Sequence, residues 1–330
     1  MMKKTLTTLM MSMTFALSAQ AVQAADEITV GYFLEWPMPF LAAKADGSYD
    51  KALGSKVTWR AFETGTAMSA AMASGDVQIS VSQGLPPFVV ATSAGQDLQI
   101  VDIAVSYSEN DNCVVAAKHE ITKDNAKELE GKKVAVPMGT AAHYGFLRQM
   151  DHFGVGLDTL EIVNMPPPEG AAALGQGAVD FACGWGGGLK RMKEHGNIMI
   201  TGAEKEELGI LVFDVTSVTA DYAAENEEQL AKFLKVTSEA NDKWNKDHDP
   251  EMLKVIAKES GMDLKDAEAS IATMAFPSTE EQMSEKWLGG GVQTFMKGVA
   301  DVFVEAKSID KALDKYDDAV NMAPLEAASK

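Results

Sequence analysis

The chain has 330 residues, a formal net charge of −19 at pH 7 and 46% hydrophobic residues. That length is enough for two compact units, each with its own core. So large an acidic excess argues against binding to nucleic acid or to an anionic membrane surface, although a small anion can still bind where nearby N–H groups outweigh the distant field.

The first residues have the pattern of an export signal. Lys3 and Lys4 precede a mostly apolar stretch at 6–17, and small residues before Ala25 offer cleavage positions. The apolar stretch is too short to span a membrane, and no second one follows. We therefore expect a signal peptide over 1–24 and an exported protein of a bacterial periplasm.

A first series of β-type and helix-forming segments follows the signal. Such alternation is typical of α/β units with parallel sheets. Pro37 and Pro39 exclude a helix from the loop at 34–39, and a second loop is expected at 82–87. The expected strands are 28–33, 57–60, 77–81 and 100–105, and the expected helices are 40–45, 66–74 and 88–94.

A second series repeats the first. Ser74-Gly75-Asp76-Val77-Gln78-Ile79 corresponds to Gln176-Gly177-Ala178-Val179-Asp180-Phe181, and each segment follows a helix of small residues. Two similar α/β units in series predict two lobes, with ligand-binding loops beyond the carboxyl ends of the strands. The expected strands are 113–117, 134–137, 160–164 and 179–183, the helices 143–153, 170–176 and 189–195, and the cleft loops 34–39, 82–87, 137–143 and 184–188.

The turn after the strand at 134–136 is a candidate anion site. Thr140 and Ala141 are small, and a helix is expected to begin near His143. Free N–H groups and the positive end of a helix dipole would then point out of the sheet, which is a geometry that holds anions. The alternative is an ordinary turn of an α/β domain without a ligand.

The segment 210–219 is a long β-type run that contains one charge, Asp214. Its length suits a strand that returns from the second lobe to the first. A carboxylate in such a run is costly unless it is paired. It either meets a ligand, faces solvent or pairs with a structural Lys or Arg.

The remainder of the chain is helical in pattern. Proline at 250 marks one helix start, 278–281 form a capping box, and three glycines at 289–291 break the pattern. Two further helices are expected at 292–307 and 309–321. We expect all of them to pack on the first lobe.

The two cysteines, Cys113 and Cys183, both border expected strands of the second lobe. Export would permit a disulfide between them. Two buried free thiols fit the sequence equally well, because the Cα separation cannot be read from it.

Recognisable catalytic motifs are absent from the sequence. It has no phosphate loop of the Walker type, no GxSxG and no Cys/His cluster, and its five histidines are scattered. His143 could act as a base, but no nucleophile is spaced beside it. This inventory favours a binding protein without cofactor or metal over an enzyme.

Several segments together resemble the taurine-binding proteins of ABC importers, within the class of aliphatic-sulfonate and nitrate binding proteins. The resemblance covers nearly the whole exported chain. It implies a type II periplasmic binding protein fold, in which two α/β lobes close on a ligand like a hinged clamp, and docking on a membrane permease. The segments are Trp59-Arg60-Ala61-Phe62 with Gly65, 73–79, Val134-Ala135-Val136-Pro137 with His143-Tyr144, Glu161-Ile162-Val163-Asn164 with the prolines after it, Trp185, and Asp214-Val215.

With this family in view, we expect lobe boundaries of 26–107 with 217–330, and 108–216. The hinge is expected near 106–112 and 214–218, and the protein is expected to be a monomer, since a clamp must open.

The resemblance implies a zwitterionic ligand, so the cleft needs two opposite poles. Asp214, helped by Glu35, is the expected partner of the ammonium, and Trp36 and Trp185 are expected to wall the site and offer a cation–π face. The expected partners of the sulfonate, through N–H groups and hydroxyls, are Ser82, Gln83, Gly84, Thr140, Ala141 and His143.

The exact ligand is left open by two departures from the family pattern. Glu35-Trp36-Pro37-Met38-Pro39 and Gly186-Gly187-Gly188 both stand where the ligand would lie. Hypotaurine, an alkanesulfonate, or a betaine-like osmolyte held between Trp36 and Trp185 are alternatives to taurine. A third possibility is an enzyme on the same fold.

Overall fold

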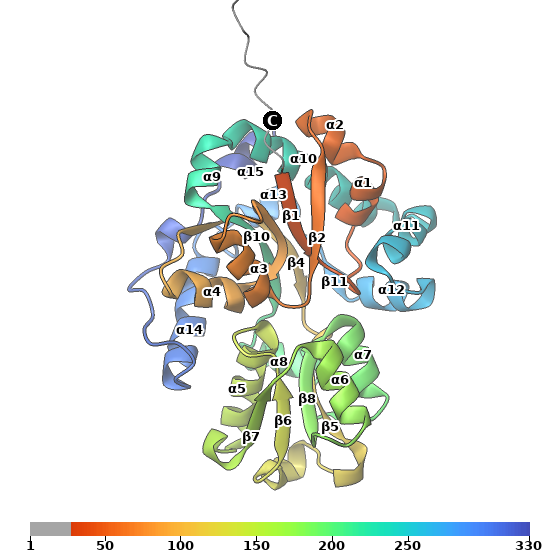
Figure 1. The fold of residues 1–330 in the computed structure, drawn as a ribbon, viewed down its shortest axis with the longest axis vertical. Coiled ribbons are helices and arrows are strands. Elements are labelled where there is room, and N and C mark those ends of the chain that lie inside the picture. Colours follow the sequence, from red (N-terminus) through yellow and green to blue (C-terminus); the bar gives the residue numbers. More distant parts are fainter. Residues whose placement is uncertain (1–27) are drawn as a thin grey trace, which may run out of the picture.

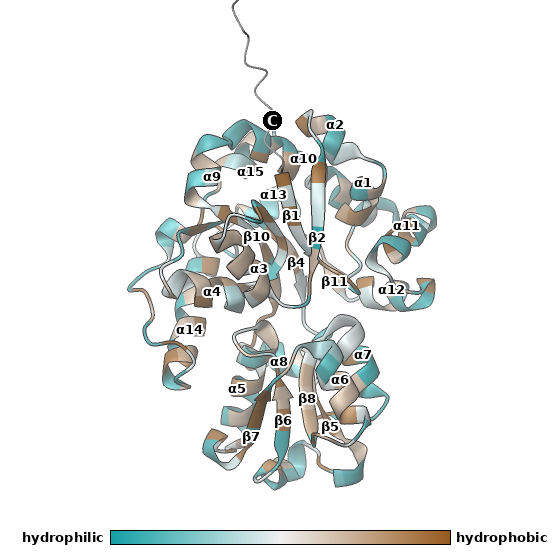
Figure 2. Cartoon of the chain, viewed as in Figure 1, coloured by the Kyte–Doolittle hydropathy of each residue, from teal (hydrophilic) through white to brown (hydrophobic). Residues whose placement is uncertain are grey.

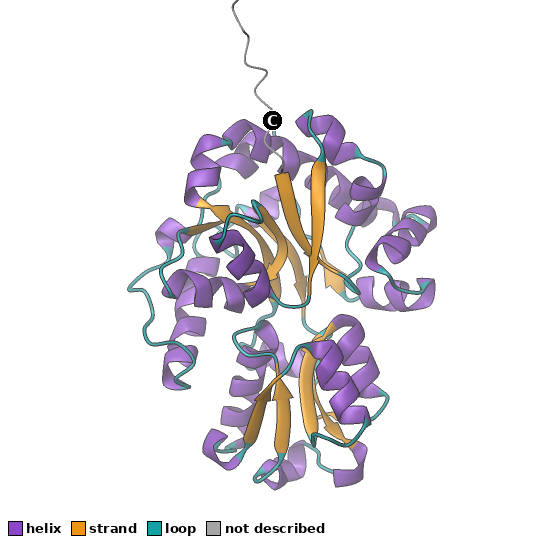
Figure 3. Cartoon of the chain, in the orientation of Figure 1, coloured by secondary structure: helices purple, strands orange, loops and turns teal. Residues whose placement is uncertain are grey.

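The computed structural model describes residues 28–330, so the signal peptide expected over 1–24 lies outside the described residues. The described chain forms two α/β lobes stacked along the long axis of the molecule (Figure 1). We call 28–107 with 213–330 lobe 1, and 111–198 lobe 2. Helices flank the sheet of each lobe (Figure 3).

Within the described residues, lobe 1 has a six-stranded sheet. Its strands are β1 (Ile28–Phe33), β2 (Val57–Phe62), β3 (Ile79–Gly84), β4 (Leu98–Tyr107), β10 (Phe213–Thr219) and β11 (Met274–Ala275). Its helices are α1 (Phe40–Ala45), α2 (Ser48–Leu53), α3 (Gly65–Ala73), α4 (Leu85–Ser93), α9 (Ala220–Glu225), α10 (Glu227–Asp247), α11 (Pro250–Ser260), α12 (Leu264–Ile271), α13 (Thr279–Gln282), α14 (Gly291–Glu305) and α15 (Ala323–Ala328).

Lobe 2 is built on a five-stranded sheet from one continuous stretch of chain. Its strands are β5 (Asp111–Ala116), β6 (Lys133–Val136), β7 (Glu161–Asn164), β8 (Phe181–Trp185) and β9 (Gly196–Ile198). Its helices are α5 (Ala141–Phe153), α6 (Pro167–Gly175) and α7 (Gly186–Lys193), and α8 (Gly202–Glu207) follows β9 on the way back to lobe 1.

Both sheets share one strand order, which confirms the predicted internal repeat. Starting from β2, the order in lobe 1 is β2-β1-β3-β10-β4-β11, and its first five positions correspond one to one to β7-β6-β8-β5-β9 in lobe 2, so β11 is an added edge strand. The strand that enters from the other lobe, β10 or β5, is antiparallel to both of its neighbours, so the sheets are mixed rather than wholly parallel. Gly75 and Gly177 occupy equivalent turns before β3 and β8, with φ of 80° and 72° that favour glycine.

The core of each lobe lies along its central strands. Every residue of β3 and of β5 is buried, since helices cover both faces of these sheets. Figure 2 shows this arrangement as brown along central strands and teal on peripheral helices such as α9. Polar side chains within β3 therefore need hydrogen-bond partners inside the protein.

The chain crosses between the lobes at 108–110 and again before β10. The backbone N–H of Tyr107 donates to the carbonyl of Val212 at 3.0 Å, so the two crossing segments run side by side. The first crossing lies within the predicted hinge segment 106–112. The second was predicted at 214–218, but those residues lie inside β10 and pair with β3 and β4, so a lobe boundary at 216 falls within a strand of lobe 1.

Two of the expected loops contain the beginnings of helices where the sequence predicts none. Ser82 to Gly84 complete β3 and Leu85 starts α4 within 82–87, and Gly186 starts α7 within 184–188. The helix expected at 170–176 also begins earlier, at Pro167 of α6. Proline is tolerated in a first helical turn, where its missing N–H is not needed. The prolines at the starts of α4 and α6 therefore belong to helices and not to loops.

The prediction of a helix at 309–321 is wrong. Among these residues only 317–319 form a short 3₁₀ turn. The buried Tyr316 hydroxyl lies 2.8 Å from that of Ser93, and the Asn321 N–H donates to the Ile100 carbonyl at 2.9 Å. Tertiary contacts with lobe 1 therefore replace the local helical preference.

Cys113 and Cys183 form a disulfide, which decides between the two alternatives left open by the sequence. They are directly opposite in the antiparallel pair of β5 and β8, with Cα atoms 3.9 Å apart. The bond lies wholly within lobe 2.

No helix among residues 28–330 has the combination of length and apolar character required to cross a membrane.

Candidate functional site

A small cavity of about 20 Å³ lies between the lobes, at the carboxyl ends of the central strands. This volume holds about one water molecule, so the lobes must separate before a larger ligand can enter. All four predicted cleft loops reach it. The predicted site residues that line this inner cavity are Trp36, Gly84, Thr140, Ala141, Trp185 and Asp214.

Asp214 is the polar centre of the inner cavity on the lobe 1 side. The Ser82 hydroxyl donates to its Oδ2 at 2.6 Å, and the Tyr107 hydroxyl donates to its Oδ1 at 2.7 Å. The Trp36 Nε1–H in turn donates to Ser82 Oγ at 2.9 Å, which leaves the Ser82 proton directed at the carboxylate. Each of these side chains is buried, so the carboxylate is held in one orientation.

Burial raises the pKa of Asp214 to about 7. The hydrogen bonds from Ser82 and Tyr107 act in the opposite direction, and the nearby carboxylate of Asp111 adds to the increase. Asp214 has no cationic partner among the described residues. The carboxylate therefore ionises less readily near neutral pH than a solvent-exposed Asp does, and a cation entering the cavity would stabilise its charged form.

A local distortion of the sheet brings the Ser82 side chain of β3 next to the Asp214 carboxylate of β10. The register of β10 against β3 shifts between Val215 and Ser217, and Ser82 has a φ of 60°, which is rare for a residue other than glycine. Backbone in this region costs energy and persists only where surrounding contacts impose it. Here the contacts with Trp36 and Asp214 impose it.

The opposite wall of the inner cavity is the first turn of α5 in lobe 2. Thr140 is the N-cap: its hydroxyl donates to the Pro137 carbonyl at 2.6 Å and accepts from the His143 N–H at 3.4 Å. The N–H groups of Ala141 and Ala142 have no acceptor within the helix, as the geometry of a first turn requires. This wall therefore offers donors and a positive dipole end to an anion.

Gln83 and His143, two predicted partners of the sulfonate, do not line the inner cavity. The Gln83 amide donates to the Gly65 carbonyl at 2.8 Å and to Ser69 Oγ, so it braces α3 against β3. His143 Nδ1 accepts from the Gly139 N–H at 3.1 Å, its ring stacks on Phe303 of α14, and burial lowers its pKa to about 4. The side chains of both residues therefore have other partners, and neither residue lines the inner cavity.

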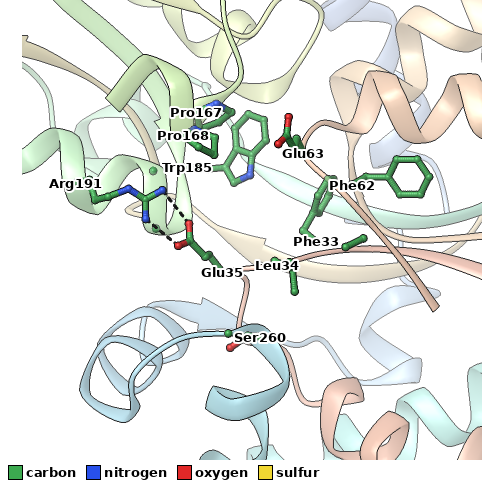
Figure 4. Close-up of a pocket in the computed structure, with 14 residues that line it drawn as sticks. Phe33, Leu34, Glu35, Phe62, Glu63, Pro167, Pro168, Trp185, Arg191 and Ser260 are labelled. Atoms are coloured by element: carbon green, nitrogen blue, oxygen red, sulfur yellow. Dashed lines mark hydrogen bonds and ion pairs between the residues drawn. The ribbon is translucent and has the colours of Figure 1, made fainter. Parts of the chain in front are cut away.

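Glu35 is also not beside Asp214. It lines a second, outer cavity of about 510 Å³, and its carboxylate accepts two hydrogen bonds from Arg191 of α7, at 2.8 and 3.0 Å (Figure 4). The predicted help for an ammonium is thus replaced by an ion pair that joins the two lobes. Lys190 of α7 and Asp266 of α12 form a second ion pair between the lobes.

The glycines at the start of α7 make room for Glu35. A Cβ atom on Gly187 would overlap the Glu35 carboxylate, and one on Gly186 would lie 2.8 Å from the Glu35 carbonyl oxygen. The backbone of α7 can approach lobe 1 this closely only without side chains there. The glycine loop of the sequence is therefore a contact surface between the lobes.

Four residues of the inner cavity were not predicted: Phe33, Gly65, Pro87 and Tyr107. Phe33 and Tyr107 are the last residues of β1 and β4, and the ends of strands are where ligands bind in such sheets. That rule could have identified both of them. No group of three or more His, Cys, Asp or Glu side chains within 28–330 is placed to hold a metal ion.

Comparison with known proteins assigns the family. The family description "NMT1/THI5 like" matches residues 37–249. The chain belongs to the NMT1/THI5-like family. As a member, it is 29% identical over 317 residues to the taurine-binding periplasmic protein of Escherichia coli K12, covering 94% of this chain and 95% of that protein.

Solved structures of periplasmic binding proteins share the fold of this family member. The alkanesulfonate-binding protein SsuA of Xanthomonas axonopodis pv. citri, bound to MOPS, superposes with a TM-score of 0.73 at 21% identity, over 90% of this chain and 98% of that one. The periplasmic nitrate-binding protein NrtA of Synechocystis PCC 6803 gives 0.72 at 14% identity, over 92% and 88%. The expected type II periplasmic binding protein fold is thereby confirmed.

Proposed function

We propose that this protein is the periplasmic solute-binding component of an ABC importer and that its ligand is taurine or a close zwitterionic sulfonate. It would bind the ligand between the lobes, leave it chemically unchanged and deliver it to a permease. One observation carries the proposal: a buried carboxylate, for which residues 28–330 provide no cationic partner, and a helix N-terminus line the same cavity from opposite lobes.

In this arrangement Asp214 holds the ammonium, and Ser82 and Tyr107 hold Asp214 in place. The sulfonate meets the N–H groups of Ala141 and Ala142. Because the two poles belong to different lobes, a ligand contacts both only when the lobes close on it, around a cavity wider than the present one of about 20 Å³, so binding and closure are coupled. The relation to the E. coli taurine-binding protein supports the choice of ligand.

Calorimetric titration of the purified protein without its signal peptide tests the proposal. Taurine should bind more tightly than ethanesulfonate, which lacks the ammonium, and more tightly than glycine betaine, whose quaternary nitrogen has no N–H to donate to Asp214. Nitrate is the control for an anion alone. Tighter binding of ethanesulfonate, betaine or nitrate than of taurine would contradict the proposed pair of poles.

A further inference from the structure

Phe33 and Trp185 separate the inner cavity from the outer one. They are the only two described residues that line both. Phe33 ends β1 on lobe 1, Trp185 ends β8 on lobe 2, and their rings meet edge to face with centroids 6.4 Å apart. A ligand longer than the inner cavity would have to pass between these two rings.

The outer cavity has room and a suitable surface for an apolar chain. Its volume is about 510 Å³, within the usual range of sites for small molecules. Phe62 and Pro167 contribute apolar walls from the two lobes, as Figure 4 shows together with Trp185. The charges of Glu35 and Arg191 are paired with each other, and the remaining charged side chain of the lining, Glu63, is exposed to solvent, so the cavity does not require a charged ligand group.

We propose that Phe33 and Trp185 set the maximum length of the ligand. The inference rests on the proposed function, since it takes the sulfonate to lie at α5. The inner cavity of about 20 Å³ has to widen for any sulfonate, and as long as the two rings stay in contact on closure, only a short carbon chain can be accommodated behind them. Removal of either ring joins the compartments and lets an extended alkyl chain run into the outer cavity.

The test is a series of unbranched alkanesulfonates, from ethane- to octanesulfonate, titrated against the wild type, Trp185→Ala and Phe33→Ala. The readout is the ratio of the Kd for octanesulfonate to that for ethanesulfonate. This ratio is insensitive to a general loss of affinity. The wild type should bind octanesulfonate more weakly than ethanesulfonate, and either variant should lower the ratio by at least tenfold, since each buried methylene adds about fourfold in affinity.

Phe62→Ala is the matched control, because it removes a ring that lines the outer cavity alone. It should leave the ratio unchanged. Circular dichroism and melting curves establish that each variant is folded. Phe33 and Trp185 lie on different lobes, so if one of the two variants fails to fold, the other still tests the proposal.

The two proposals fail in different ways. Wild-type protein that is folded but binds neither taurine nor ethanesulfonate overturns the proposed function and the length limit with it. If the wild type binds taurine, but octanesulfonate as tightly as ethanesulfonate, or if neither variant changes the ratio, the length limit alone is overturned.

Discussion

The carboxylate of Glu35 on lobe 1 and the guanidinium of Arg191 on lobe 2 are joined by two hydrogen bonds, at 2.8 and 3.0 Å, although 156 positions separate them in the chain. Such a two-pronged contact fixes the orientation of both groups. It can form only when the lobes are closed, so it adds to the stability of the closed form and, through it, to ligand affinity.

Loss of this ion pair should weaken taurine binding modestly. The side chains are 38% and 42% exposed, so solvent screens the interaction, and Glu35→Gln should raise the Kd about two- to fivefold. The effect should shrink at high salt, and a double-mutant cycle with Arg191→Gln should show coupling. Lys297→Gln, which breaks a pair within α14, is the control. An equal rise in Kd for Lys297→Gln, or no coupling, would contradict this role.

Gly187→Ala should separate closure from stability. Alanine at a position with compatible backbone stabilises a protein by about 0.4–1 kcal/mol relative to glycine, so the ligand-free protein with its lobes open should melt no lower than the wild type. The added methyl group would overlap the Glu35 carboxylate and hold the lobes apart. Calorimetry should therefore show at least a tenfold weaker affinity for taurine. Gly298→Ala, at a helical position with open space around it, should leave affinity unchanged; a loss there too would argue against a specific contact.

Asp214→Asn should abolish tight binding while stabilising the empty protein. Truncating one partner of a buried charge pair costs about 2–5 kcal/mol, which is at least thirtyfold in Kd. The raised pKa means that ionisation of Asp214 costs stability in the ligand-free protein, so the variant should melt a few degrees higher at pH 8.

Asp102→Asn is the control for that experiment. Asp102 is equally buried, burial raises its pKa too, and it accepts a hydrogen bond from Thr216 rather than lining either cavity. It should change the melting temperature and leave the affinity for taurine as it is. Undiminished taurine binding by Asp214→Asn would contradict the proposal that Asp214 binds the ammonium.

Taurine binding should depend on pH around the pKa of Asp214. The ammonium pairs with the carboxylate, whereas below about pH 7 the empty protein carries the protonated acid. Binding must then expel a proton, so the apparent Kd should rise as pH falls, by up to about tenfold per pH unit. Titrations in buffers of different ionisation enthalpy should show proton release at pH 6. A Kd that is constant from pH 8 to pH 5 would be inconsistent with this pairing.

The repeat and the cleft could be predicted from the sequence because they depend on local patterns. The matching segments at 74–79 and 176–181 indicated two equivalent lobes, and Asp214 stood out as the one charge in an apolar strand. The contacts of Gln83 and Glu35 could not be predicted in the same way. Their partners lie on other elements, and only the folded geometry decides whether a polar side chain turns toward the cavity or toward a neighbouring helix.

The position of β10 between β3 and β4 constrains the order in which the two lobes can fold as the chain is synthesised. The sheet of lobe 1 has a gap at its centre until residues 213–219 have been synthesised, whereas lobe 2 is complete once residue 198 has emerged. The later lobe in the sequence can therefore acquire its native structure first. During that time the segment 28–107 cannot complete its sheet. The edges of β3 and β4 that later pair with β10 are exposed to chaperones or to aggregation.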